Sequence, residues 1–154
     1  MKNTAMIQTI LGPVIISEQD GFITELFFTE DTQQKTANRI TPLLKEAEKQ
    51  LLEYLSGVRK IFDLKTAPQG TEFQKAVWST LHSIPYGETR SYKQVAEMIG
   101  RPEASRAVGM ANSKNPILVF TPCHRILGTD GRLVGYAGGL ERKKRLLELE
   151  KNYV

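Results

Sequence analysis

Residues 71–113 read TEFQKAVWST LHSIPYGETR SYKQVAEMIG RPEASRAVGM ANS, and this stretch decides the organisation of the C-terminal half of the chain. Thr71 and Ser91 are each followed three residues later by glutamine, which is the capping-box pattern that begins a helix. Residues 100–102, Gly-Arg-Pro, then break the chain. The predicted helices cover about 72–83, 92–99 and 103–113. A short helix, a turn with glycine and a second helix are typical of a helix-turn-helix, although many helical pairs that do not bind DNA share this spacing.

The residues before this stretch predict a small sheet and one helix. The turn signals Gly12-Pro13 and Asp20-Gly21 separate runs of β-branched and aromatic residues. Strands are predicted at Ala5–Leu11, Val14–Glu18, Phe22–Phe28 and Lys60–Leu64. A helix is predicted over Pro42–Ser56, because Thr41 can cap it and Gly57 can end it. Its apolar stripe consists of Leu44, Ala47, Leu51 and Leu55.

These elements together predict the fold class α/β, of the α+β kind. Residues 1–67 are expected to form an N-terminal domain with a sheet and a helix. Residues 68–154 are expected to form a mainly helical C-terminal domain that carries the helix-turn-helix. The junction falls in residues 66–70, Thr-Ala-Pro-Gln-Gly. A chain of 154 residues fits one compact domain or two small ones packed together.

Charge is distributed unevenly along the chain, whose net charge is +4. Residues 1–67 carry 8 Lys and Arg against 9 Asp and Glu, whereas residues 68–154 carry 13 against 8. The C-terminal half is therefore the part where a polyanion such as nucleic acid would dock, although many basic surfaces are only solvated. No segment approaches the ~20 apolar residues that span a bilayer, and the N-terminus lacks the apolar core of a signal peptide. We therefore expect a cytoplasmic protein with no membrane partner.

Cys123 lies in Thr121-Pro122-Cys123-His124-Arg125-Ile126, directly after the apolar run Ile117–Phe120. One cysteine excludes a disulfide within the chain, and two histidines argue against a Cys/His zinc site. A lone cysteine is more often an inert buried residue than a nucleophile. His124 is the nearby base, but neighbours in a helical turn point about 100° apart, so a bridging water is the more natural proton path. Such a histidine needs an acid to orient it, which spacing does not identify.

The segment Pro122-Cys123-His124-Arg125-Ile126 resembles the active-site signature of the O6-alkylguanine-DNA alkyltransferases, also called methylated-DNA–protein-cysteine methyltransferases. The resemblance covers about residues 71–151. It includes Phe73-Gln74 with Val77-Trp78, Ile84-Pro85 with Gly87, Ser91-Tyr92, Ser105–Gly109, Asn115-Pro116, Gly135–Leu140, Leu146-Leu147 and Glu150. These segments follow one another in the family's order and spacing.

This resemblance implies DNA repair by direct reversal, in which an alkyl group moves irreversibly from O6-alkylguanine to Cys123 in a single turnover. Glu150 is then expected to orient His124, and His124 to deprotonate Cys123 through water. Tyr92 is expected to donate a proton or hydrogen bond to the guanine as negative charge develops on it. A buried structural role is the alternative for Tyr92, as are surface or capping roles for His124 and Glu150. The resemblance implies no metal and no organic cofactor.

The implied partner is double-stranded DNA with an alkylated guanine, bound in the minor groove by a protein expected to be a monomer. Arg106 is implied to fill the space that the rotated nucleotide leaves, whereas without the motif a phosphate contact or ion pair is the simpler interpretation. The small residues implied to allow close approach to the groove are Ala104, Ser105, Ala107 and Gly109. The implied substrate pocket involves Ile126, Tyr136, Ala137 and Asn115. Some relatives have serine in place of Ala137, but the implied contact is a backbone N–H.

Two other functions remain open at the level of sequence. A regulatory DNA protein would bind the lesion and leave Cys123 unmodified. A cysteine hydrolase would use Cys123 and His124 over many turnovers, although such enzymes usually recruit their histidine from a distant segment. The two alternatives differ from alkyl transfer in whether Cys123 is permanently modified.

Overall fold

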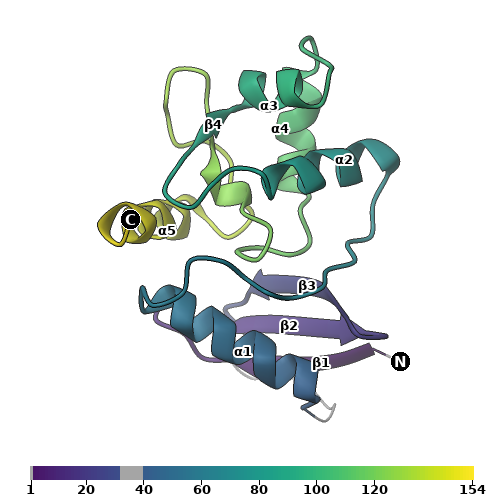
Figure 1. The fold of residues 1–154 in the computed structure, drawn as a ribbon, viewed down its shortest axis with the longest axis vertical. Helices are drawn as coiled ribbons and strands as arrows, with labels where there is room; N and C mark the ends of the chain where they lie inside the picture. Colours follow the sequence, from purple (N-terminus) through teal and green to yellow (C-terminus); the bar gives the residue numbers. More distant parts are fainter. Residues whose placement is uncertain (1, 32–39) are drawn as a thin grey trace.

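The computed structural model describes residues 2–31 and 40–154, and it has a small sheet at one end and a group of helices at the other (Figure 1). The N-terminal elements are β1 (Lys2–Ile7), β2 (Val14–Gln19), β3 (Phe22–Phe28) and α1 (Pro42–Leu55). They are followed by α2 (Glu72–Leu81), β4 (Arg90–Ser91), α3 (Tyr92–Met98), α4 (Ser105–Ser113), the 3-10 turn η1 (Cys123–Arg125), β5 (Ile126–Leu127) and α5 (Leu140–Asn152). The predicted α+β class is confirmed.

The sheet is antiparallel in the order β1-β2-β3. Asp20 and Gly21 connect β2 to β3 with φ angles of 55° and 86°, as a two-residue hairpin turn requires. The prediction of a first strand at Ala5–Leu11 is wrong at both ends, because β1 covers Lys2–Ile7. The chain turns before Leu11, since the Thr9 hydroxyl accepts the N–H of Leu11 and donates to the carbonyl of Gly12.

The predicted strand at Lys60–Leu64 is also wrong. Side chains, rather than a neighbouring strand, pair its backbone: Gln50 of α1 donates to the carbonyl of Asp63 and accepts its N–H, and Arg59 donates to the carbonyl of Ile61. The segment reaches the sheet only afterwards, where Thr66 forms a single bridge with Ile23. The segment Lys60–Leu64 therefore packs against α1 and does not add a strand to the sheet.

The predicted helices are confirmed with small shifts at their ends. Thr41 caps α1, and both predicted capping boxes are present at the starts of α2 and α3. Helix α2 ends at Leu81 instead of residue 83, because the chain tightens into turns there. Helix α4 begins at Ser105 instead of residue 103, because the N–H of Ala104 bonds to the carbonyl of Arg101 in the preceding turn. Helices α3 and α4 pack on each other as the two helices of the predicted motif.

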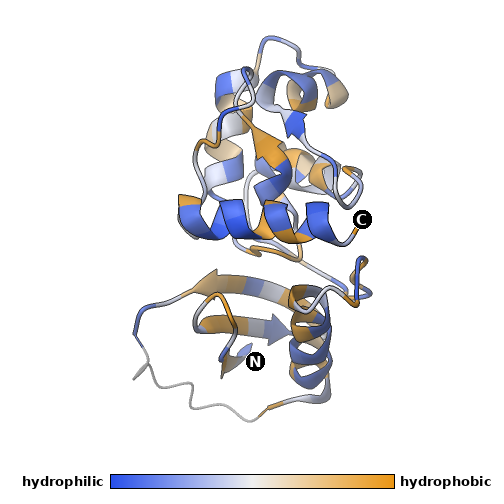
Figure 2. Cartoon of the chain, turned by 90° about the vertical axis from the view of Figure 1, so that its left-hand side faces the viewer, coloured by the Kyte–Doolittle hydropathy of each residue, from blue (hydrophilic) through white to orange (hydrophobic). Residues whose placement is uncertain are grey.

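One hydrophobic core runs through both halves of the protein. The edge strand β3 holds the segment before Cys123, because the N–H of Leu26 bonds to the carbonyl of Pro116 and its carbonyl accepts the N–H of Leu118. Helix α5 crosses between the sheet and the other helices, and its outward side is mostly hydrophilic (Figure 2). Arg142 of α5 also donates to the carbonyl of Leu11. The N-terminal sheet therefore supports the segment that carries the cysteine, and the domain division between residues 67 and 68 stays a prediction.

Within residues 2–31 and 40–154, no helix combines the length and the apolar character needed to cross a bilayer.

Candidate active site around Cys123

The loop before Cys123 is held by one buried side chain. Asn115 donates to the carbonyls of Ile117 and Thr121, at 3.2 and 3.3 Å, and accepts the N–H of Ile117 at 3.0 Å. Inside this loop, Val119 has a φ of 70°, and the N–H of the next residue bonds back to the carbonyl of Leu118. A β-branched residue rarely adopts this conformation, so the surrounding contacts must impose it. Asn115 thus fixes the approach to Cys123, whereas its predicted part in the substrate pocket stays a prediction.

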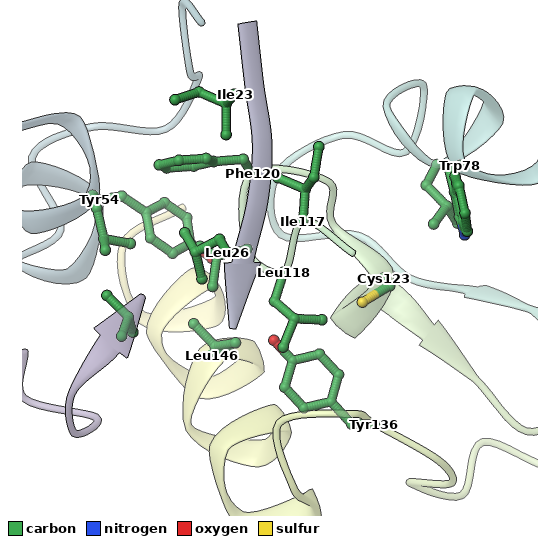
Figure 3. Packing of buried hydrophobic residues seen from close by; sticks show 14 of the residues in the cluster. Ile23, Leu26, Tyr54, Trp78, Ile117, Leu118, Phe120, Cys123, Tyr136 and Leu146 are labelled. Carbon is green, nitrogen blue, oxygen red and sulfur yellow. The ribbon is translucent and has the colours of Figure 1, made fainter. Parts of the chain in front are cut away.

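Cys123 itself begins the 3-10 turn η1 and is only 1% exposed. Its sulfur points into the core region that contains Leu118 and Tyr136 (Figure 3). Burial raises the pKa of the Cys123 thiol to about 11, and a hydrogen bond from Asn115 and the charge of Lys143 only partly oppose this. The resting group is therefore a neutral thiol, which is a poor nucleophile until a base removes its proton.

The next residue, His124, pairs with a carboxylate at the C-terminal end of the chain. Its Nε2 lies 2.8 Å from Oε2 of Glu150, and both side chains are buried. Burial lowers the pKa of His124, and the contact with Glu150 does not fully offset this. A neutral imidazole that donates from Nε2 to a carboxylate must carry its free electron pair on Nδ1. That Nδ1 atom is buried and has no hydrogen-bond partner within the part of the chain that the structure describes.

Glu150 remains ionised in this setting. Burial alone would raise its pKa, but hydrogen bonds and charges from His124 and Arg125 hold the pKa of the carboxyl well below its usual range. Arg125 donates to both carboxylate oxygens at 2.9 Å, and the N–H of Gly87 donates to Oε1 at 3.0 Å. The predicted imidazole–carboxylate pair is thus present, and the Arg125 guanidinium also binds the carboxylate.

Two tyrosines and a short strand surround the sulfur. The Tyr92 hydroxyl donates to the carbonyl of Val134 at 3.3 Å, and the nearby Cys123 adds to the effect of burial in raising the pKa of Tyr92. Tyr136 is buried with no partner for its hydroxyl among the described residues, and Ile126 of β5 is fully buried. Ala137, in contrast, is exposed. Tyr92 also lines an open hollow of about 570 Å³ with Gly128, Thr129, Asp130, Arg132 and Val134.

Comparisons with known proteins agree with this site. A family model described as the DNA-binding domain of 6-O-methylguanine DNA methyltransferase matches residues 72–152. A methylated-DNA–protein-cysteine methyltransferase from Methanosarcina barkeri is 46% identical over 151 residues, which is 96% of each chain. The constitutive enzyme of that name from Bacillus subtilis is 45% identical, over 94% of this chain and 92% of its own. The chain belongs to the methylated-DNA–protein-cysteine methyltransferase family.

Solved structures extend the likeness to the whole fold. The Mycobacterium tuberculosis O6-methylguanine methyltransferase is 42% identical, with a TM-score of 0.89, and the match covers 100% of this chain and 95% of that one. The M. tuberculosis protein in complex with DNA is 43% identical, with a TM-score of 0.87, over 99% and 94% of the two chains. The family resemblance stated from the sequence is therefore confirmed, and it extends to the N-terminal half of the chain.

The residues predicted to contact DNA in this methyltransferase family lie on α4 or, for Ala104, directly before it. Arg106 and Ala107 are exposed, whereas Ala104, Ser105 and Gly109 are half-buried. Gly109 faces the ring of Tyr92, which is 3.7 Å from where a Cβ would lie. The outward face of α4 consists of Arg106, Ala107, Met110 and Ser113, followed by Lys114 at the helix end. Met110 is 69% exposed in this face and was not among the residues predicted from the sequence.

Lys143 of α5 was also missed. It is fully buried, its Nζ donates to the carbonyls of Val134 and Gly135, and burial lowers its pKa to about 8. Its positive charge lowers the pKa of Cys123. The helical spacing of Lys143, Leu146 and Glu150 is the sequence signal that could have identified Lys143 as buried, because these residues share one face of α5. Lys143 therefore connects the loop after β5 to the cysteine.

Proposed function

We propose that this methyltransferase repairs DNA by moving an alkyl group from O6 of a guanine in the duplex to Sγ of Cys123. One observation carries the assignment: the single buried thiol directly precedes a neutral imidazole whose Nε2 is held by a carboxylate and whose Nδ1 is unpartnered among the described residues. This arrangement supplies a base for a thiol that burial otherwise keeps protonated.

The chemistry follows from these atoms. His124 Nδ1 takes the Cys123 proton, through a water if the two do not meet directly, and Glu150 stabilises the imidazolium. The thiolate attacks the alkyl carbon in line with the C–O bond, and the electron pair of that bond goes to the guanine. Tyr92 donates to the base and stabilises the charge that develops there. The guanine takes up one proton, and the imidazolium releases the proton that it took from Cys123, so that His124 is neutral again. The products are an unmodified guanine and a thioether on Cys123.

The reaction ends there. A thioether sulfur is a poor leaving group, and the sequence contains no second cysteine to accept the alkyl group. Each molecule therefore repairs one lesion.

The lesion reaches the sulfur only if it leaves the base stack, because an O6 substituent inside the duplex is out of reach of a side chain. The exposed face of α4 supports docking in the minor groove, with Arg106 occupying the space of the rotated nucleotide. Because Cys123 is 1% exposed, the guanine must also displace part of the wall around it. We expect the segment with Gly135, Tyr136 and Gly139 to be the part that moves, because glycine has a wider range of accessible backbone conformations than other residues. Ile126 and Ala137 then offer backbone groups to the base. A cytoplasmic location and a monomeric state remain predictions from the sequence.

Intact-protein mass spectrometry tests the proposal. After incubation with a duplex that contains one O6-methylguanine, the protein should gain the mass of one methylene unit on Cys123, and Cys123→Ala should gain nothing. An unmethylated duplex of the same sequence is the matched control. Binding of the methylated duplex without a mass gain would identify a lesion-binding protein instead, and repeated turnover of an ester or peptide would identify a hydrolase.

A further inference from the structure

A tyrosine from the N-terminal half enters the hydrogen-bond network behind Cys123. Tyr54 lies in the last turn of α1 and is completely buried. Its hydroxyl donates to Oε2 of Glu150 and lies 3.3 Å from Nε2 of His124. The sequence motifs of the C-terminal half do not include this residue, which is 70 positions from His124 and 96 from Glu150.

The ring of Tyr54 is held by aromatic neighbours. Phe62 packs against it with ring centroids 5.1 Å apart, and Tyr86 meets it edge-on at 6.1 Å. Phe62 in turn packs edge-on against Phe120, in the loop that leads to Cys123. Packed aromatic rings of this kind have little rotational freedom, so the hydroxyl is fixed relative to Glu150.

We propose that Tyr54 is a positioning residue of the alkyl-transfer site, whose hydroxyl holds Glu150 in place and limits the negative charge that Glu150 presents to His124. The inference rests on the proposed function. It makes α1 part of the catalytic apparatus, because the N-terminal half supplies a group that the C-terminal half lacks.

The Tyr54 hydroxyl acts on one carboxylate oxygen that it shares with other donors. Oε2 of Glu150 accepts from Tyr54, from His124 and from Nη2 of Arg125. Each donor takes a share of the charge on that oxygen, so the loss of one strengthens its interaction with the others. Without the Tyr54 hydroxyl, Glu150 stabilises a protonated His124 more strongly, and the pKa of His124 rises. A protonated His124 cannot accept the proton of Cys123.

The other charged and titratable groups around the pair come from three segments, because Cys123 and Arg125 both belong to η1. Arg125 precedes β5, Lys143 lies on α5, and Tyr86 lies in the loop after α2. Cys123 directly precedes His124 in the sequence. All of these remain in place when only the hydroxyl of Tyr54 is removed, so its contribution can be isolated.

The test uses Tyr54→Phe in the full-length protein and the free base O6-benzylguanine, which reacts without DNA docking. The rate of Cys123 benzylation is followed by intact mass between about pH 5 and pH 9, where a histidine titrates. We expect the midpoint of the acidic limb to move up by about half to one pH unit, the change that one hydrogen bond to a charged group can produce. At a pH well below the wild-type midpoint the rate should fall about three- to tenfold, and at pH 9 it should approach that of the wild type.

Tyr86→Phe is the matched control. It removes a tyrosine hydroxyl from the same aromatic cluster, but that hydroxyl is buried and has no partner among the described residues. Its midpoint should equal that of the wild type.

A fluorinated tyrosine placed site-specifically at position 54 provides a test in the opposite direction, and it keeps the hydroxyl if Tyr54→Phe folds poorly. Fluorine makes the phenol a stronger donor, so the midpoint should move down.

Unchanged midpoints in both Tyr54 variants would overturn the inference, even if thermal melting showed a loss of stability, because a purely structural tyrosine changes stability without changing the titration. If wild-type Cys123 does not become benzylated at any pH, the proposed function fails first and the inference with it.

Discussion

The surroundings of Cys123 and the outward face of α4 are built in opposite ways. Around the cysteine, His124 and Glu150 are 0% and 1% exposed and share a dense set of hydrogen bonds. On α4, Arg106 and Met110 extend into solvent, and the helix start lacks a side-chain cap. The chemistry is therefore set up before substrate arrives, whereas the docking surface is completed only by its partner.

Because the two regions differ in this way, substitutions can separate DNA binding from alkyl transfer to Cys123. Changes in the buried network should alter the reaction with free base and duplex alike, and they should also affect folding. Substitutions on α4 should alter only the reaction with duplex DNA and leave the reaction with free base unchanged.

The largest effect is expected from Glu150→Gln. The amide leaves the Arg125 guanidinium buried without its counter-charge, so the free energy of unfolding should fall by about 3–5 kcal/mol. His124 also loses its orienting carboxylate, so Cys123 benzylation should slow by about 100-fold. Chemical denaturation and the rate with O6-benzylguanine measure the two effects. A loss of less than 1 kcal/mol would show that the buried ion pair is not important for stability.

The pH dependence of stability gives a control for the same carboxylate. Because the folded pKa of Glu150 lies below the unfolded value of about 4.3, its stabilising contribution is complete above that value and is lost as pH falls toward the folded pKa. The stability difference between wild type and Glu150→Gln should therefore shrink as pH is lowered below about 5. A difference that grows in acid would reverse the sign assigned to this group.

Arg106→Ala tests the second of the two regions, the outward face of α4. Without a side chain to fill the vacated space, repair of a methylated duplex should slow by about 10- to 100-fold, because unstacking costs a few kcal/mol. Reaction with free O6-benzylguanine should stay within about twofold of the wild type, since no stack is opened there. Ser113→Ala, on the same exposed face, is the matched control. Equal losses on the two substrates would refute the role assigned to Arg106.

The smallest effect is expected from Tyr92→Phe, which lies where the two regions meet. Loss of one hydrogen bond to the guanine should slow transfer by about tenfold, with nearly unchanged duplex affinity. Single-turnover kinetics and fluorescence anisotropy measure the two quantities. If affinity collapses instead, Tyr92 is structural, and its packing on Gly109 of α4 gives the reason.

Local signals in the sequence predicted most of the helices, because the caps at Thr41, Thr71 and Ser91 act within four residues of themselves. The strand predicted at Lys60–Leu64 failed because the backbone partner there is a side chain of α1, which no local pattern reveals. Within the candidate site, the resemblance supplied Cys123, His124 and Glu150, and the structure brings His124 and Glu150 into contact.

The positions that the sequence did not predict depend on contacts between distant segments. Tyr54 of α1 reaches Glu150 of α5, and Lys143 of α5 reaches the carbonyl of Val134, only because the fold brings these segments together. In sequence, Tyr54 looks like one more apolar position of an amphipathic helix. Lys143 is one of four consecutive basic residues that look solvent-exposed in the sequence. Only its spacing from Glu150 distinguishes it from the other three.

The left-handed conformation of Val119 has a consequence for the reacted protein. A residue of this type held at a φ of 70° stores about 1–3 kcal/mol, and Asn115 and the packed core keep it there. An alkyl group on the neighbouring buried sulfur needs volume that the tight interior does not offer, and overpacking costs a similar amount. The alkylated protein should therefore be less stable than the unreacted protein, with a lower melting temperature. This difference would let cellular proteases degrade the alkylated protein and spare the unreacted protein.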